Sequence, residues 1–131
     1  MRLWHYRLIP LLPRQQLLGQ HRECCALRGN GWGRKHATVD YVFRHSPYML
    51  VQYHLLVLRE MQRRGYRYDA LWEAPEYRGK HCPEHWTGDW RNQETATVYY
   101  PEHNEAYLIE CLDNLHRKGI VVDCPVNISV L

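Results

Sequence analysis

The stretch PYMLVQYHLLVLREMQRRG, residues 47–65, contains the clearest helical pattern in the chain. Pro47 stands where a helix can begin without losing a hydrogen bond, and Gly65 follows a basic final turn. Val51, Leu55 and Leu58 recur at intervals of four and three residues, so they share one face. Because the four residues that begin at Leu55 are all apolar, we expect this segment to form a central, well-buried helix.

A second helix is predicted before this stretch, over about residues 13–27, PRQQLLGQHRECCAL. Pro13 suits the first helical position, and Leu17, His21 and Cys24 follow at helical spacing. The segment RGNGWGRKH, residues 28–36, comes next, and its three glycines end the helix and predict a loop.

A third helix is predicted over NEAYLIECLDNLHRKG, residues 104–119. Asn104 is a favourable N-cap, and Gly119 follows a basic last turn, as is typical after the C-terminal end of a helix. Leu108, Leu112 and Leu115 form one apolar stripe. This helix therefore has both end signals and a face to bury.

The remaining segments are less regular. A short helix is predicted over residues 37–44, and residues 66–103, with prolines at 75, 83 and 101, should be mostly loop. The tail, residues 120–131, is β-branched in part and should form a short strand or lie extended over the core. The sequence thus predicts a mostly α fold: a compact single-domain bundle of about three main helices with long loops, spanning residues 1–131.

Composition limits the class of protein. A chain of 131 residues with 45% hydrophobic residues can bury a modest core as one domain, and its net charge of +3 does not by itself argue for nucleic acid. No apolar run approaches the roughly 20 residues that span a bilayer, and no signal-peptide cleavage pattern follows the start. Five cysteines, an odd number, favour reduced thiols. We expect a cytoplasmic monomer that does not bind membranes.

Arg22 and Glu23 place a cation and a carboxylate side by side on the predicted helix 13–27. Gly19 lies three residues before Arg22 and four before Glu23, so it shares their part of the helix surface. A missing side chain there opens space for a ligand backbone to approach the carboxylate, at a cost of about 1 kcal/mol in helix propensity. The alternative is a solvated surface pair, and the pattern alone leaves both open.

Five cysteines and nine histidines raise the question of a metal site. Cys24 and Cys25 are adjacent, and neighbouring side chains on a helix point about 100° apart, so they rarely bind one ion together. There is no CxxC pair, and HCPEH, residues 81–85, lacks a second half. We therefore expect small core residues and free thiols, with no metal.

The loop GNGWG, residues 29–33, differs from nucleotide-binding loops because it follows a helix where those follow a strand. It can instead present Trp32, Arg34, Lys35 and His36 to a phosphodiester, since backbone N–H groups, cations and a stacking aromatic are combined there. An ordinary surface loop is the alternative.

The order of several segments resembles the pyrimidine-dimer DNA glycosylase family of the phage T4 endonuclease V type. The segments are LLPRQQLLGQHRE (11–23), KHATVDYVF (35–43), LLVLREMQRRGY (55–66), APEYRG (74–79) and HRKG (116–119). The most specific element is the pair Arg22–Glu23, at the family's distance from the N-terminus. The resemblance implies a helical domain whose N-terminal segment runs between helices and brings the α-amine beside the glutamate.

The resemblance also implies a mechanism. The amine of Met1 would attack C1′ of the damaged nucleotide, expel the base and form an imine, with Glu23 stabilising charge and transferring protons and Arg22 holding a phosphate. Beta-elimination then cuts the strand. This chemistry is physically reasonable because an α-amine has a pKa near 8 and is readily neutral at physiological pH. The implied substrate is double-stranded DNA with damaged or modified pyrimidines, and no cofactor is required.

The chain departs from the family's type member in two places. Arg2 stands where that protein has a threonine whose amine is exposed by removal of methionine, so the nucleophile is expected on Met1, or on Arg2 if Met1 is removed. Ala26 occupies a position that carries a basic DNA contact, for which Arg28 is a possible substitute. The further expected DNA contacts are Arg2, Arg14, Arg28, Arg34, Lys35, His36, Arg117 and Lys118.

Two other functions remain open from the sequence. The first is a non-catalytic helical nucleic-acid-binding module on the same scaffold, which would bind DNA without forming an imine. The second is a small metal-binding protein that uses the cysteines and histidines, which would bind zinc in a fixed ratio.

Overall fold

The structure is a computed structural model that describes residues 2–36, 38–82, 86 and 99–127. Its three main helices are α1 (Arg14–Arg28), α2 (Pro47–Arg63) and α3 (Glu105–Arg117). Short 3-10 helices connect or precede them: η1 (Tyr6–Leu11), η2 (Asp40–Arg44) and η3 (Ala70–Glu73). No strand occurs within these described ranges. The expected all-helical bundle with three main helices is therefore confirmed.

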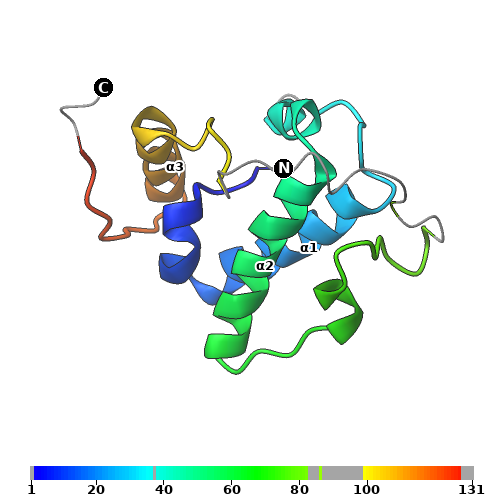
Figure 1. Ribbon diagram of the computed structural model, residues 1–131. Coiled ribbons are helices and arrows are strands. Elements are labelled where there is room, and N and C mark those ends of the chain that lie inside the picture. Colours follow the sequence, from blue (N-terminus) through cyan, green and yellow to red (C-terminus); the bar gives the residue numbers. More distant parts are fainter. Residues whose placement is uncertain (1, 37, 83–85, 87–98, 128–131) are drawn as a thin grey trace.

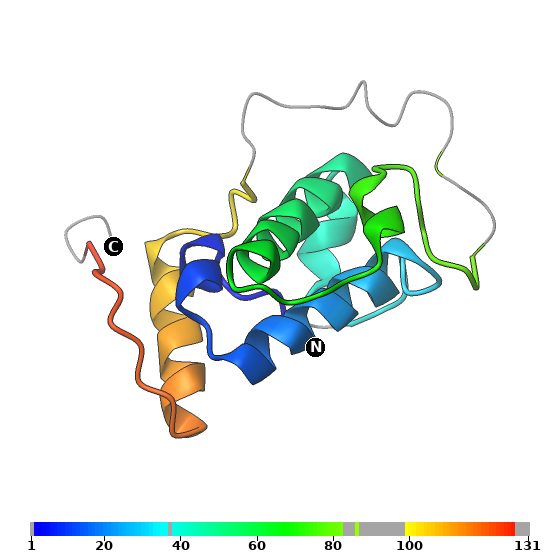
Figure 2. The same cartoon turned by 90° about the horizontal axis from the view of Figure 1, so that it is seen from below.

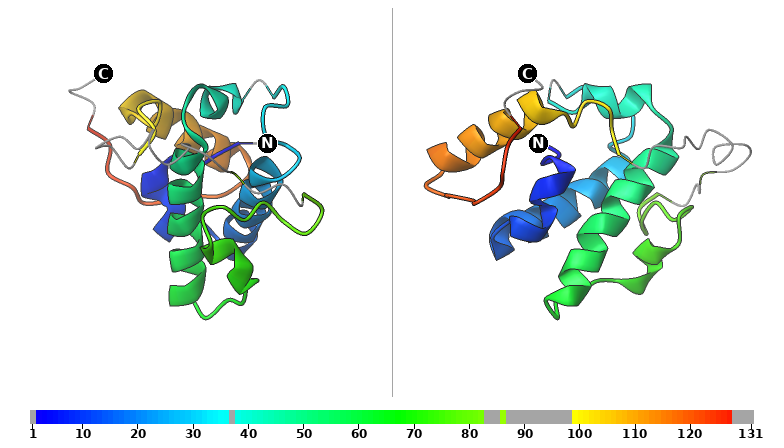
Figure 3. Two further views of the ribbon diagram at one scale, coloured as in Figure 1. Left: turned by 45° about the vertical axis from the view of Figure 1, so that its right-hand side comes forward. Right: turned by 60° about the vertical axis from the view of Figure 1, so that its left-hand side comes forward.

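The central pair of helices is α1 and α2, which cross and pack against each other (Figure 1). On one side of this pair lie α3 and the C-terminal segment, and on the other side lies the segment 66–82 with η3 (Figures 1 and 3). Leu17 from α1, Leu50 and Leu58 from α2, and Leu108 and Leu115 from α3 are fully buried between these parts. Burial of this shared core is what holds the three helices together.

The ends of the helices follow the signals in the sequence. The Ser46 hydroxyl caps α2 by accepting the N–H of Tyr48, and the Asn104 side chain caps α3 by accepting the N–H of Tyr107. Gly65 and Gly119 follow α2 and α3 with φ of 78° and 79°, the left-handed region in which glycine is favoured. These local signals explain why the predicted bounds of both helices lie close to the observed ones.

The N-terminal segment is a part of the core that the helix predictions left out. It runs into η1, which lies between α2 and α3 (Figure 2). Leu3 and Leu8 are fully buried, and Trp4 is only 6% exposed. Because this segment is enclosed by the helices, its position is determined by all three of them.

The less regular segments before α2 and after α3 can be compared with what the sequence predicted for them. The helix expected over residues 37–44 is the shorter 3-10 helix η2, and residue 37 lies outside the described part of the chain. The described tail, residues 120–127, is extended rather than a strand. Alternate tail residues pack partly buried against the core, namely Ile120, Val122, Cys124 and Val126.

Candidate active site

The backbone of residues 2–4 is bound by side chains from all three helices. On α1, the Glu23 carboxylate accepts the N–H of Arg2 at 3.4 Å, and Gln20 bonds the same segment. The hydroxyl of Tyr53, on α2, donates to the Trp4 carbonyl oxygen at 2.6 Å. The hydroxyl of Tyr107, on α3, donates to the Leu3 carbonyl oxygen at 2.5 Å. The start of the described chain is therefore fixed beside Glu23.

Glu23 opens into a small polar cavity of about 250 Å³. Arg2 and Lys118 contribute positive charge to this cavity, and both lie over the ring of Trp4, at 6.0 and 5.7 Å from its centre. Arg2 also forms an ion pair with Glu110 of α3 at 3.5 Å. The described residues that line it are Arg2, Trp4, Glu23, Thr38, Asn114 and Lys118.

Burial raises the pKa of the Glu23 carboxyl above its ordinary value. The N–H of Arg2, the amide of Gln20 and the positive charge of Lys118 act in the opposite direction, because each favours the ionised form. Such a carboxyl is held in a site with donors and cations, yet it accepts a proton more readily than an exposed glutamate. It is therefore suited both to stabilising positive charge and to transferring protons.

Arg22 is exposed on α1, outside the lining of this cavity. A Cβ atom placed on Gly19 would lie 3.7 Å from the Arg22 guanidinium and would meet nothing of Glu23 within 4 Å. The sequence predicted that the space left by Gly19 would lie next to the Glu23 carboxylate. In the structure this space lies next to Arg22 instead.

Most of the other side chains expected to contact DNA are exposed outside the cavity, namely Arg14, Arg34, Lys35, His36 and Arg117. In the loop of residues 28–36, Arg34 donates to the Asn30 carbonyl oxygen, and the half-buried ring of Trp32 packs edge-on against Phe43. The loop therefore presents Arg34 and Lys35 to solvent, whereas Trp32 is half-buried against Phe43.

Arg28 does not fit the expected DNA contact, because its side chain is fully buried. Its guanidinium donates to the carbonyl oxygens of Trp72, Ala74 and Tyr77 and bonds the ring of His54. Burial lowers its pKa to about 10, which still leaves the group charged at neutral pH. Arg28 fastens the segment 72–77 to α1, and its one donor without a partner, Nε, is buried away from any phosphate.

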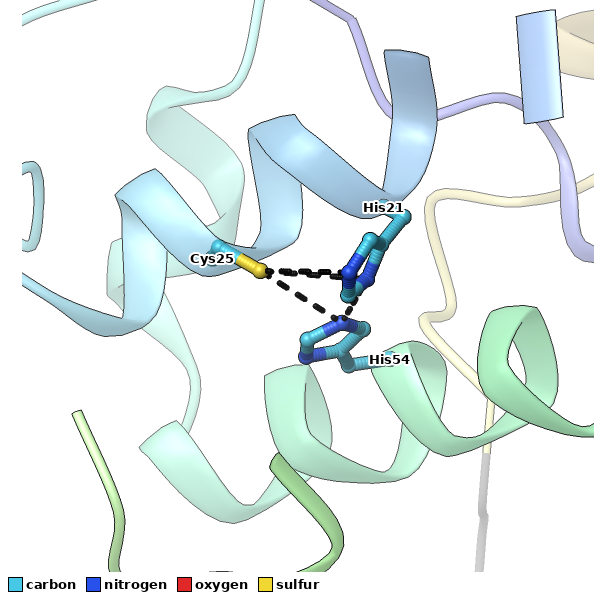
Figure 4. A group of neighbouring side chains, drawn as sticks. All are labelled: His21, Cys25 and His54. Atoms are coloured by element: carbon cyan, nitrogen blue, oxygen red, sulfur yellow. Dashed lines mark hydrogen bonds between the residues drawn. The ribbon is translucent and has the colours of Figure 1, made fainter. Parts of the chain in front are cut away.

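His21 and Cys25 of α1 and His54 of α2 form the one cluster of possible metal ligands among the described residues (Figure 4). This cluster was not predicted from the sequence, because His21 and His54 are on different helices. Cys24, by contrast, is a buried core residue as expected. In the fragment HCPEH, residues 83–85 lie outside the described part.

Hydrogen bonds account for the geometry of this cluster. Arg28 can only donate, so Nδ1 of His54 accepts its hydrogen bond at 3.0 Å. The proton of the neutral His54 ring is therefore on Nε2, which donates to Nδ1 of His21 at 2.9 Å. Sγ of Cys25 lies 3.7 and 3.8 Å from the two ring nitrogens of His21, so neither lone pair points at it. Burial raises the pKa of the Cys25 thiol to about 12. The arrangement is that of a hydrogen-bonded chain ending at Arg28.

Comparison with known proteins assigns the family. A family model described as pyrimidine dimer DNA glycosylase matches residues 1–74, more than half of the 131-residue chain. The chain belongs to the pyrimidine dimer DNA glycosylase family, which confirms the resemblance seen in the sequence. Comparisons with curated proteins and with solved structures gave no match. Family membership implies a glycosylase whose substrate is damaged DNA.

The matched region contains Arg2, Trp4 and Glu23 but not the wall of the cavity that Asn114 and Lys118 supply. Gln20, Trp4, Thr38 and Asn114 were not among the site residues expected from the sequence. None of them belongs to a chemical motif. Gln20 lies one helical turn before Glu23, whereas the folding of distant segments brings Trp4, Thr38 and Asn114 to it.

Proposed function

We propose that this family member is a DNA glycosylase with AP-lyase activity, which excises pyrimidine dimers or another modified pyrimidine with an N-terminal amine as nucleophile. The observation that carries the proposal is the position of residue 2: its backbone nitrogen lies 3.4 Å from the Glu23 carboxylate, in a cavity that Arg2 and Lys118 line.

The reaction begins when the neutral amine attacks C1′ of the damaged nucleotide. The glycosidic bond breaks, the base leaves with the bonding electrons, and the opened sugar forms an imine with the amine. Loss of a C2′ proton then breaks the C3′–O bond. Glu23 stabilises the positive charge on the sugar as the base departs, and a carboxyl with a raised pKa can then carry the protons that these steps move.

The nucleophile is the amine of Met1 where that residue is retained, and that of Arg2 where it is removed. Met1 lies outside the described residues. Met1 is bonded directly to Arg2, the first described residue of the segment that the helices hold beside Glu23.

Exposed cations supply the attraction for the DNA backbone. Arg22 on α1, with Arg34 and Lys35 in the loop of residues 28–36, can neutralise phosphates whatever the base sequence of the DNA. The damaged nucleotide must leave the base stack before its sugar can meet an amine. We propose double-stranded DNA as the partner, bound so that the extruded sugar enters the cavity of Glu23.

Borohydride trapping tests the proposal. Tag-free protein of known intact mass is incubated with abasic and dimer-containing duplexes, and the crosslinked residue is mapped. We expect a crosslink at the N-terminal residue, and a loss of about 100-fold or more in Glu23→Gln. Asp113→Asn, an exposed carboxylate of α3 outside the cavity, is the matched control and should crosslink normally.

The possible results separate the candidate functions. A crosslink on abasic DNA alone would limit the protein to lyase chemistry on sites made by another enzyme. Salt-sensitive DNA binding with no crosslink, from protein whose N-terminus is free, would overturn the proposal and identify a non-catalytic binding module.

A further inference from the structure

Gln20 is a buried polar residue on α1 whose carboxamide is fully hydrogen-bonded. The side chain is 1% exposed. Its Oε1 accepts the N–H of Trp4 at 2.7 Å and lies 2.8 Å from the Tyr53 hydroxyl, whose single hydrogen it shares with the Trp4 carbonyl oxygen. Its Nε2 donates to the Arg2 carbonyl oxygen at 3.0 Å and to Oε2 of Glu23 at 3.1 Å. Both N–H donors of the carboxamide are used and its oxygen accepts a backbone N–H, so the orientation of the group is fixed.

The bonds to Arg2 and Trp4 are those that a neighbouring β-strand would make. In a parallel pair, one residue binds the carbonyl of residue i−1 and the N–H of residue i+1 on the facing strand. The Gln20 carboxamide makes this pair of bonds to residues 2 and 4 with side-chain atoms alone. A shift of the chain by one residue would turn these backbone groups to the opposite side. Gln20 therefore fixes the register of the N-terminal segment.

The same carboxamide also holds the carboxylate. Gln20 lies three residues before Glu23, so both side chains lie on the same part of the helix surface. Its second N–H bonds the oxygen of Glu23 that accepts the N–H of Arg2. One rigid group thus fixes the two parts whose distance the chemistry depends on.

We infer that Gln20 is a positioning residue, which sets the N-terminal segment in register and holds the Glu23 carboxylate against it. This role rests on the function proposed above. Its contacts are with backbone atoms of residues 2 and 4, so the arrangement is independent of the side chain at position 2. It accommodates an arginine there as readily as a smaller residue.

Loss of the Gln20 donor has a definite effect on Glu23. Among the described residues, the charged side chains that line the cavity with the carboxyl are Arg2 of the N-terminal segment and Lys118, which follows α3. Glu110 of α3 partly neutralises Arg2, and the N-terminal amine also favours the ionised carboxylate. These remain when Gln20 is replaced. The N–H of Gln20 favours the ionised carboxylate, so its removal moves the protonation of Glu23 to higher pH.

The test uses Gln20→Met, which keeps the length of the side chain, and Tyr53→Phe as the matched control. Tyr53→Phe removes the hydroxyl that binds Trp4 and Gln20 but leaves the Gln20 donors to Arg2 and Glu23. Single-turnover borohydride trapping on abasic duplex is measured from pH 5 to 9, together with affinity for a duplex containing a tetrahydrofuran site. The titration of the Glu23 side-chain carboxyl is followed by NMR.

We expect Gln20→Met to bind the tetrahydrofuran duplex within about threefold of wild type, while trapping slows by about tenfold or more. The acid limb of its rate profile and the Glu23 titration should both move to higher pH. Tyr53→Phe should lower the melting temperature but should shift neither the acid limb of the rate profile nor the Glu23 titration. Gln20→Leu, which removes the donors and the acceptor without adding a charge, provides the same comparison if the methionine variant does not fold.

An unchanged profile and an unchanged Glu23 titration in a folded Gln20 variant would overturn the inference. An equal shift of the rate profile and of the Glu23 titration in Tyr53→Phe would also overturn it. If wild-type protein forms no crosslink, the proposed function fails, and the Glu23 titration still decides whether Gln20 holds the carboxylate.

Discussion

At the scale of single residues, two arginines six positions apart on α1 have opposite surroundings. Arg28 is fully buried against backbone carbonyls, whereas Arg22 is exposed. Sequence spacing cannot separate them, because both belong to the same run of helix and both are cationic. Only the segment 72–77, which folds back over α1, removes Arg28 from solvent.

We predict that Arg28→Met lowers the free energy of unfolding by roughly 3 kcal/mol or more, because it leaves several buried carbonyls without donors. Arg22→Ala should change stability by less than about 0.5 kcal/mol. It should instead reduce the slope of DNA affinity against salt by about one. Urea unfolding and binding at several salt concentrations measure both, and an unfolding midpoint for Arg28→Met equal to wild type would refute the structural role.

At the scale of elements, the three main helices could be predicted because their signals are local. Ser46 before Pro47 and Asn104 before Glu105 lie next to the elements they begin, and the apolar spacing lies within them. The helix η1 was not predicted, since Pro10 and Arg7 interrupt its apolar pattern and it is stabilised by α2 and α3.

The candidate site could be predicted only in part for the same reason. Glu23 and the nearby cations Arg2 and Lys118 were expected from the family resemblance. Gln20 was not, because its partners are backbone atoms 16 and 18 residues away and leave no trace in residue type.

The glycines of α1 and its following loop give a prediction for this element. Gly31→Ala should destabilise the protein by about 1–3 kcal/mol, because a Cβ there would lie 2.7 Å from the Ala26 carbonyl oxygen. Gly19→Ala should stabilise it by up to about 1 kcal/mol, since the new methyl group meets only an ordinary contact and the helix gains propensity. Thermal unfolding checks both, and melting temperatures that change in the same direction would contradict this account of the loop.

At the scale of the whole molecule, buried histidines join the N-terminal segment to the helices. His103 accepts the N–H of Tyr6 and bonds the Tyr41 hydroxyl, and His5 lies in the same group of stacked rings. Burial lowers the pKa of His5 to about 4 and that of His103 to about 3. Burial also lowers the pKa values of His21 and His54. These rings are therefore neutral in the folded protein.

We predict that stability falls as the pH is lowered from about 6.5 to about 4. In this range the unfolded chain, whose histidines have pKa values near 6.5, binds protons that the folded protein does not. Each buried histidine contributes a loss on the order of 1 kcal/mol per pH unit until its folded pKa is reached. Urea unfolding at pH 7, 6 and 5 measures the slope. Equal free energies at pH 7 and 5 would contradict the prediction.

The attachment of residues 2–4 to all three helices also has a consequence for biosynthesis. Tyr107 and Lys118 leave the ribosome more than 100 residues after the segment that they help to enclose. Until then a nascent chain carries Glu23 and Gln20 without the wall that α3 provides. The cavity is completed only when α3 and Lys118 have been translated, so a product interrupted before them keeps the amine and the glutamate but lacks the closed site.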